Sequence, residues 1–348
     1  MTDIQHVSVN SNGVHIHAAI QGEGPIVLLC HGMPGLWYSW RYQMQALADA
    51  GYKAVAIDQR GFGQSDRPTK VADYTSKHTV ADVIAVLDHL QAEQAILVGT
   101  DFGAAQVYNC AVRHPDRVRA VVGIACPYDF DFSGRGCAGS SAVSSGTITR
   151  TFARPDMSPN ECFAAIAKHQ FFYAHYYQTP GMAEKEFAAK PAEFLQKLFW
   201  NLSADGNLLD QSHWPENPQG YCDVLKSPDR PLPWSWLSQE DFDYYLEQFC
   251  DAESKKEFIG GINLYRVADE NWHINAQYAD ANITQPSMFI AGEKDAVLLM
   301  IDEQALEAFK SRCDDLWDIA LIEGAGHFVQ MEKPEQTNAV LLKFLESL

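Results

Sequence analysis

The stretch Gly99-Thr100-Asp101-Phe102-Gly103 places a carboxylate in a tight turn between an apolar run and a helix-like segment. The flanking glycines permit the strained backbone that such a turn requires. A carboxylate that displaces a group from saturated carbon leaves an ester, which a histidine and water can hydrolyse. A serine would leave an ether, which they cannot hydrolyse. Asp101 therefore predicts displacement at saturated carbon, as in epoxide opening or dehalogenation, rather than ester or peptide hydrolysis.

An acid and a histidine follow Asp101 along the chain in the order that such a nucleophile needs. Asp295 comes just after an apolar run that ends at Gly292, and His327 lies in a Gly-flanked segment after the next run. We expect His327 to activate water and Asp295 to orient the imidazole. Asp129 is the alternative acid, because related enzymes can carry the acid after an earlier strand. Asp295 is preferred because it follows a clear strand that ends in glycine.

The segment from His31 to Gly35 follows another buried apolar run and carries two glycines and a proline. The backbone N–H groups of Met33 and Phe102 are expected to form an oxyanion hole for the ester hydrolysis step. A plain turn between a strand and a helix is the alternative interpretation, because glycine and proline are common in such turns.

The elements that must position these residues alternate between strand-like and helix-like patterns. Strands are predicted at 14–20, 26–30, 53–57, 95–98, 118–125, 287–291 and 318–322. Helices are predicted at 42–50, 79–92, 103–114, 301–311 and from residue 334 onward. Alternation of this kind predicts an α/β fold with a mostly parallel central sheet flanked by helices.

The alternation stops between residues 129 and 284. A Gly/Ser-rich segment (133–146) and a Pro-rich segment (214–236) lie among aromatic, helix-like stretches at 163–177, 183–200 and 239–250. This pattern predicts a mainly helical cap at 129–284, inserted into a core formed by residues 1–128 and 285–348.

Composition excludes several classes of partner. The chain has 348 residues and a net charge of −19, which argues against nucleic acid and anionic membrane surfaces. No apolar run approaches the roughly 20 residues of a membrane span, and the first residues do not resemble a signal peptide.

The eight cysteines form no Cys-x-x-Cys pair, which favours reduced thiols and a cytoplasmic location. No His/Cys cluster has metal-ligand spacing, so neither a metal nor a cofactor is expected. The Gly-spaced segment at 58–63 does not match a nucleotide-binding fingerprint and is expected to be structural.

Taken together, these segments resemble the α/β-hydrolase-fold epoxide hydrolases of the soluble type over nearly the whole chain. The similarity is carried by the turn around Asp101 and by residues 31–34, 37–43, 58–65 and 324–327. Two cap segments, 171–181 and 261–266, are similar to those that supply ring-opening tyrosines in that family. The resemblance implies Tyr173 and Tyr265 as the proton-donating pair, with Tyr176 as the substitute for Tyr173. An epoxide oxygen leaves as an alkoxide, which needs a proton or strong hydrogen bonds at neutral pH.

Two departures from related families bear on the reaction. Thr100 and Phe102 stand where His and Trp are usual in the epoxide hydrolases. Haloalkane dehalogenases resemble this core but hold the halide with side-chain N–H donors, which Phe102 and Met33 lack. Fluoroacetate-type dehalogenases carry arginines just after the nucleophile, where this chain has Ala104-Ala105-Gln106. A haloalkane dehalogenase that uses Asp101 remains the alternative, followed by a non-catalytic hydrolase-like ligand-binding protein.

The sequence therefore predicts an epoxide hydrolase that forms a vicinal diol through an ester on Asp101. An apolar pocket is expected around Phe102, with the further lining residues Trp37, Phe172, Tyr177 and Phe328. The predicted partners are a small hydrophobic epoxide and water, and a homodimer is left open.

Overall fold

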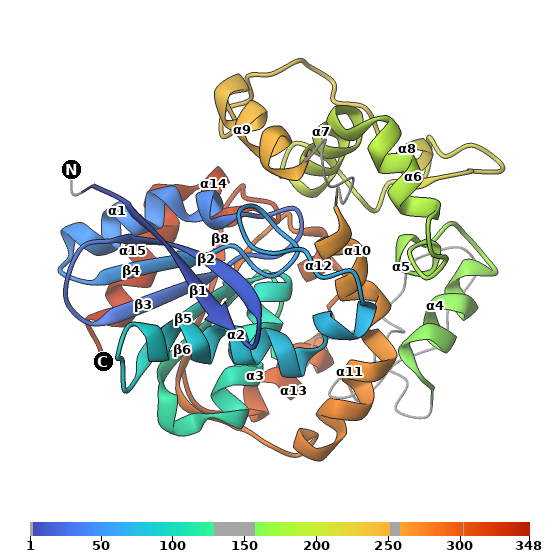
Figure 1. The fold of residues 1–348 in the computed structure, drawn as a ribbon. Coiled ribbons are helices and arrows are strands. Elements are labelled where there is room, and N and C mark those ends of the chain that lie inside the picture. Colours follow the sequence, from blue (N-terminus) through green and yellow to red (C-terminus); the bar gives the residue numbers. More distant parts are fainter. Residues whose placement is uncertain (1–2, 129–156, 251–257, 302) are drawn as a thin grey trace.

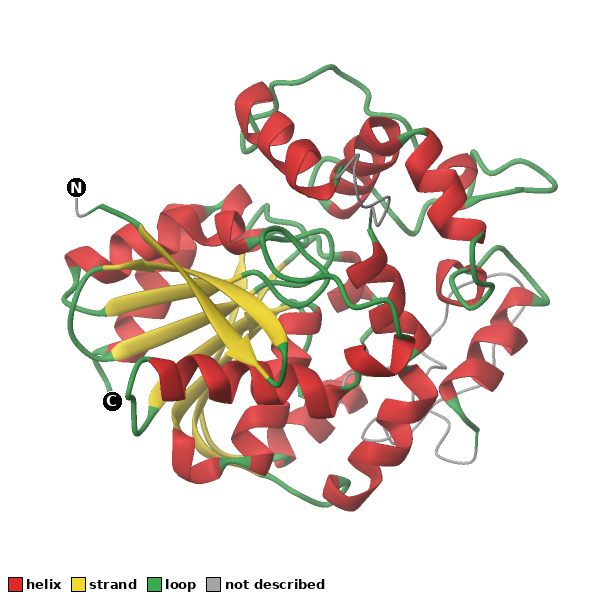
Figure 2. Ribbon diagram, viewed as in Figure 1, coloured by secondary structure: helices red, strands yellow, loops and turns green. Residues whose placement is uncertain are grey.

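Eight strands form one sheet that is parallel except at one edge (Figures 1 and 2). The structure, a computed structural model, describes residues 3–128, 157–250, 258–301 and 303–348. In sheet order the strands are β1 (Gln5–Ser11), β2 (Val14–Gln21), β4 (Lys53–Ile57), β3 (Ile26–Cys30), β5 (Ala95–Thr100), β6 (Val118–Ile124), β7 (Ile283–Gly292) and β8 (Cys313–Ile322). β2 pairs antiparallel with β1 and β4, and the other neighbours are parallel.

Helices cover both faces of the sheet, as an α/β architecture requires. One face is covered by α1 (Arg41–Asp49) and α15 (Pro334–Leu345), and the other by α2 (Ser76–His89), α3 (Phe102–Arg113) and α13 (Glu303–Ser311). Shorter helical segments are η1 (Trp37–Trp40), η2 (Val71–Tyr74), η3 (Pro115–Arg117), η4 (Ala276–Tyr278), α12 (Ala296–Leu299) and α14 (Val329–Glu332). Every residue of β5 is buried, which is typical of a central parallel strand covered on both faces.

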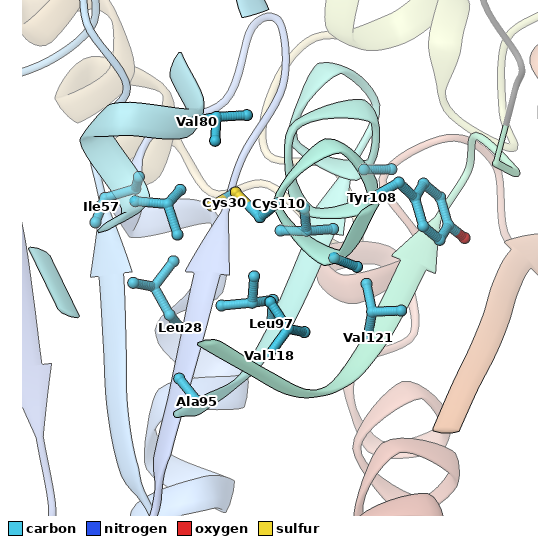
Figure 3. Close-up of a cluster of buried hydrophobic side chains, with 14 of the residues drawn as sticks. Leu28, Cys30, Ile57, Val80, Ala95, Leu97, Tyr108, Cys110, Val118 and Val121 are labelled. Atoms are coloured by element: carbon cyan, nitrogen blue, oxygen red, sulfur yellow. The ribbon is translucent and has the colours of Figure 1, made fainter. Parts of the chain in front are cut away.

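The core beneath α3 fixes the strand that carries Asp101. Leu28 of β3 pairs in register with Leu97 of β5, which pairs with Val121 of β6. These side chains point to the same face, and Tyr108 and Cys110 of α3 pack over that face of the sheet (Figure 3). Because these side chains are buried and close-packed, β5 and the start of α3 form a rigid support for the turn between them.

The helices between β6 and β7 gather on one side of the molecule, beyond the sheet (Figure 1). They are α4 (Pro159–Ala167), α5 (Tyr173–Tyr176), α6 (Met182–Ala189), α7 (Pro191–Leu202), α8 (Tyr221–Val224), α9 (Gln239–Phe249), α10 (Ile259–Arg266) and α11 (Ala268–Asn275). Their core is largely aromatic. The boundaries at 129 and 284 stay a prediction, because residue 129 and the Gly/Ser-rich segment 133–146 lie outside the described residues.

The structure differs from the sequence prediction at β1 and within two predicted cap helices, and it adds α10 and α11, where no helix was predicted. β1 was not predicted, because most of its residues are exposed and its conformation depends on pairing with β2. The predicted helix at 163–177 is two helices, α4 and α5. The predicted helix at 183–200 is also two, because Lys190 has an extended φ of −144° before Pro191. A residue that precedes proline avoids the helical region, so α6 ends there and α7 begins.

Within the described ranges, none of the helices has the length and apolar character needed to cross a membrane.

Candidate active site

Asp101 occupies the strained turn between β5 and α3, with φ +55° and ψ −122°. Positive φ is uncommon for any residue other than glycine and persists only where the surroundings enforce it. Here the surroundings are three glycines in close approach. A Cβ on Gly103 would clash with the carbonyl oxygen of Cys30, and one on Gly32 would clash with the Asp101 carboxylate. One on Gly99 would clash with the backbone of Gly103.

His327 stands between two carboxylates. Its Nδ1 lies 3.0 Å from Oδ1 of Asp295, and its Nε2 lies 3.6 Å from Oδ2 of Asp101. Asp295, at the carboxyl end of β7, is fully buried, and its Oδ1 also accepts a hydrogen bond from the Val297 N–H at 2.9 Å. Burial lowers the pKa of His327, but the Asp295 and Asp101 carboxylates outweigh it and raise the pKa well above its usual range.

Backbone contacts hold the loop that carries His327. The His327 N–H donates to the Leu202 carbonyl of α7 at 3.0 Å. The Glu332 carboxylate accepts hydrogen bonds from the N–H groups of Gly326 at 3.1 Å and Phe328 at 3.1 Å, on either side of His327. Burial raises the pKa of Glu332 to about 7, although these backbone N–H groups favour its ionised form. Sequence reasoning missed Glu332, and its spacing of five residues from His327 gives no signal of this role.

The expected oxyanion-hole loop lies against the nucleophile. The Met33 N–H donates to Oδ1 of Asp101 at 2.8 Å. Phe102 is the first residue of α3, where a backbone N–H has no partner within the helix. His31 braces the loop: the Gln59 N–H donates to its Nε2 at 3.0 Å, so the proton is on Nδ1, which donates to the Gly32 carbonyl at 2.7 Å. Burial lowers the pKa of His31, consistent with a neutral ring.

Tyr173 of α5 and Tyr265 of α10 lie together beside the nucleophile. Their ring centroids are 5.4 Å apart with the planes perpendicular, and the Tyr265 ring lies 4.8 Å from that of Phe102. Both phenols are protonated at neutral pH and can donate, since the pKa of tyrosine is ordinarily about 10 and burial raises it further here. The Tyr176 hydroxyl instead donates to Oε2 of Glu186 at 2.9 Å. The geometry therefore favours Tyr173 over Tyr176.

A cavity of about 190 Å³ opens beside these groups. Asp101, Phe102, Tyr173 and Tyr265 all line it. The cavity brings a carboxylate and two phenol donors together, which is the arrangement that opening of a strained ether needs.

Four side chains predicted to line the pocket do not line this cavity. Trp37 is buried elsewhere, and its indole N–H donates to the Tyr244 hydroxyl at 2.9 Å. Phe328 stacks on Trp236 with ring centroids 5.6 Å apart. Both are aromatic neighbours of site residues along the chain, but their side chains pack into the core rather than toward Asp101.

The other two predicted lining residues, Phe172 and Tyr177, support the cap tyrosines from behind. Phe172 packs against Tyr173 at a ring-centroid distance of 5.3 Å, and Tyr177 packs against Tyr265 at the same distance. Both are buried. Neither side chain is among the residues that line the cavity at Asp101, although Phe172 and Tyr173 both line a smaller cavity in the cap. Their role in binding substrate stays a prediction.

Asp129, the alternative acid, lies outside the described residues. Among the described residues, no group of three or more His, Cys, Asp and Glu side chains is placed to hold a metal ion. The absence of a cofactor stays a prediction. The segment 58–63 is a structural loop in which Asp58 accepts the Trp37 N–H at 2.9 Å and the Gln64 N–H at 3.0 Å.

The sheet order and the Asp101–Asp295–His327 arrangement define an α/β-hydrolase-fold protein, and a family model described as alpha/beta hydrolase fold matches residues 25–138. The chain is 37% identical to epoxide hydrolase A of Mycobacterium tuberculosis, with 98% of this chain and 97% of that protein covered. It is 33% identical to epoxide hydrolase 1 of Siraitia grosvenorii, covering 99% of both. The crystal structure of epoxide hydrolase A from Mycobacterium thermoresistibile superposes with a TM-score of 0.81 at 37% identity, over 99% of this chain and 98% of that one. The chain therefore belongs to the epoxide hydrolase family.

Proposed function

We propose that the protein converts a hydrophobic epoxide to a vicinal diol through a covalent ester on Asp101. The observation that carries this proposal is the placement of Asp101 with Tyr173 and Tyr265 on one cavity. The similarity to epoxide hydrolases of Mycobacterium tuberculosis and Siraitia grosvenorii supports the same reaction.

In the first half-reaction, a carboxylate oxygen of Asp101 attacks an epoxide carbon and the carbon–oxygen bond of the ring breaks. Tyr173 and Tyr265 donate hydrogen bonds to the ring oxygen, which would otherwise leave as an alkoxide. Both phenols keep their protons at neutral pH, because the ordinary pKa of tyrosine is about 10 and burial raises it further. One of the two phenols transfers its proton to the ring oxygen as the bond breaks and later regains a proton from solvent, so the product of this step is a hydroxyalkyl ester of Asp101.

In the second half-reaction, His327 takes a proton from water, which attacks the ester carbonyl. Formation of the ester removes the negative charge of Asp101, which lies 3.6 Å from Nε2 of His327 and raises its pKa. The pKa of His327 therefore falls once the ester forms, although Asp295 still raises it, and this fall favours the neutral imidazole that acts as the base. The Met33 and Phe102 N–H groups stabilise the oxyanion.

A panel of epoxides and haloalkanes tests this function against its alternatives. We expect diol formation from epoxides and no halide release from haloalkanes, because Phe102 and Met33 carry no side-chain N–H to hold a halide. Halide release without diol formation would establish a dehalogenase, and no turnover of either class would point to a ligand-binding homologue.

The proposed partners are a small epoxide and water, and a homodimer stays a prediction. A cytoplasmic location is proposed from the cysteines. Of the cysteines that the structure describes, all but Cys250 are buried, which is typical of reduced thiols.

A further inference from the structure

The cavity continues away from Asp101 along α3. Phe102, Ala105, Asn109 and Val112 line it, and their spacing of three or four residues places them on one face of the helix. From Phe102 to Asn109 the helix rises roughly 10 Å. A substrate whose epoxide lies at Asp101 therefore has room for a chain that reaches a second set of side chains.

That second set is polar, and neighbouring donors fix the orientation of two of its amides. The Ser76 N–H donates to Oδ1 of Asn271 at 2.6 Å, and the Ser76 hydroxyl donates to Oδ1 of Asn275 at 3.1 Å. The Arg113 guanidinium also donates to Oδ1 of Asn275. Because a backbone N–H and a guanidinium can only donate, both amides must present oxygen to them and cannot be reversed.

The contacts described above use only the oxygens of these two amides, so their NH₂ groups take no part in them. Asn271 and Asn275 lie one turn apart on α11, and both line the cavity. Neither Nδ2 has a hydrogen-bond partner among the described residues. The unpaired Oε1 of Gln106, in the same wall, is fully buried and out of reach of a ligand. This end of the cavity therefore offers donors.

The charge beside these amides is positive, and it would attract the same electron-rich oxygen that their N–H donors would bind. Arg113 bonds to the neutral oxygens of Ser76, Asn109 and Asn275, and no carboxylate pairs with it in the described part of the chain. Asp101, at the opposite end, is the one carboxylate among the described residues that line the cavity. An electron-rich oxygen placed at Asn271 and Asn275 would meet donors and a nearby cation.

We propose that Asn271 and Asn275 form a specificity subsite for an oxygen hydrogen-bond acceptor. The preferred substrate is then an elongated epoxide with a carbonyl or carboxylate oxygen roughly 10 Å from the ring. This inference rests on the proposed function, because it places the epoxide at Asp101.

The test uses three epoxides of equal chain length that end in a carboxylate, a primary amide or a methyl group, together with a short aryl epoxide. For the wild-type protein we expect kcat/KM to be roughly tenfold or more higher for the carboxylate and the amide than for the methyl compound. The two oxygen-bearing substrates also distinguish a charged from a neutral acceptor. Equal kcat/KM for all three would overturn the subsite. Failure to hydrolyse any epoxide, the short one included, would instead overturn the proposed function.

Asn271→Asp and Asn275→Asp keep the side-chain shape and the oxygen that faces Ser76, and replace each free donor with an acceptor. Each should remove the preference for the carboxylate, because the introduced carboxylate repels it, while leaving kcat/KM for the short epoxide, which does not reach this end of the cavity, unchanged. Gln277→Glu adds the same charge at an exposed position just beyond α11 and should change none of these values. Retention of the preference in both Asn variants would overturn the proposal.

A measurement on the wild-type protein alone keeps the test independent of how the variants fold. The three corresponding diols should inhibit turnover of the short epoxide, with the carboxylate and amide diols binding roughly tenfold more tightly than the methyl diol. Equal inhibition by all three would overturn the subsite.

Discussion

Nε2 of His327 lies 3.6 Å from Oδ2 of Asp101, so the proposed base and the proposed nucleophile influence each other's charge. While Asp101 is ionised, it raises the pKa of His327 and holds the imidazole in its charged form. When Asp101 becomes an ester, that influence disappears. This contact favours the proposed order of the two half-reactions, because loss of the Asp101 charge shifts His327 toward the neutral form that can act as a base.

His327→Gln should separate the half-reactions. Ring opening needs the Asp101 carboxylate, whereas ester hydrolysis needs the water activated by His327, so the variant should react once and then stop. Intact mass spectrometry after mixing with an epoxide should show the protein plus one substrate mass. Asp101→Asn provides the control and should show no adduct. A folded His327→Gln protein that stays unmodified would contradict the ester mechanism.

Asp101→Asn should also lower the pKa of His327. In the wild-type protein the Asp101 carboxylate raises this pKa, whereas burial lowers it. Without the charge of Asp101, the lowering by burial is opposed less strongly. An NMR titration of the His327 ring in both proteins measures the difference directly. In the wild-type protein the charged imidazole should persist to higher pH than in the variant. Identical titration curves would show that the two side chains are not coupled.

Tyr265→Phe should slow epoxide opening by roughly 10²–10⁴-fold, the usual contribution of a positioned acid. Tyr173→Phe should act in the same direction, because the two phenols share the ring oxygen. Tyr176→Phe is the matched control: its hydroxyl is bonded to Glu186, 2.9 Å away, and the rate should not change. Full activity in both Tyr265→Phe and Tyr173→Phe would refute the assignment of the proton donors.

The origin of the product oxygen tests Asp101 as nucleophile. In a single turnover with excess enzyme in ¹⁸O-labelled water, the diol should lack the label, since its new oxygen comes from the Asp101 carboxylate. Solvent oxygen should appear in Asp101 as the ester is hydrolysed, which mass spectrometry of the peptide would show. Labelled diol in the first turnover would mean direct attack by water.

Glu332 should make the protein less stable as pH rises. Its pKa is about 7 in the folded protein against 4.5 for an unperturbed carboxyl, so the folded state binds more protons between these values. The protonated Glu332 stabilises the folded state fully below pH 4.5, and this stabilisation is lost as pH rises through 7, by roughly 1–3 kcal/mol.

The free energy of unfolding should be measured by denaturation at several pH values across this range. That of the wild-type protein should fall, as pH rises, relative to that of Glu332→Gln. The exposed Glu335→Gln control should follow the wild type. A constant difference between wild type and Glu332→Gln would contradict the shift.

The sequence determined the backbone of the site. The apolar run of β5 and the glycines around Asp101 predict the turn, because steric limits on φ and ψ act within a few residues. Asp101, Asp295 and His327 each follow a predicted strand. Because the carboxyl ends of parallel strands lie at one edge of a sheet, the sequence predicts that these three side chains lie close together. The structure brings these three side chains within the distances that such convergence requires.

Only the tertiary structure decided where side chains beyond these three point. Tyr173 and Tyr176 are equally plausible donors in the sequence, and the packing of α5 against α10 turns only Tyr173 toward the cavity. The same packing placed Phe172 and Tyr177 behind the tyrosines rather than in the cavity wall. The donors of Asn271 and Asn275 could not be foreseen either, because α2 and α3 supply the groups that orient these amides. Such directions are set by contacts between segments far apart in the chain, and no local pattern of residues encodes them.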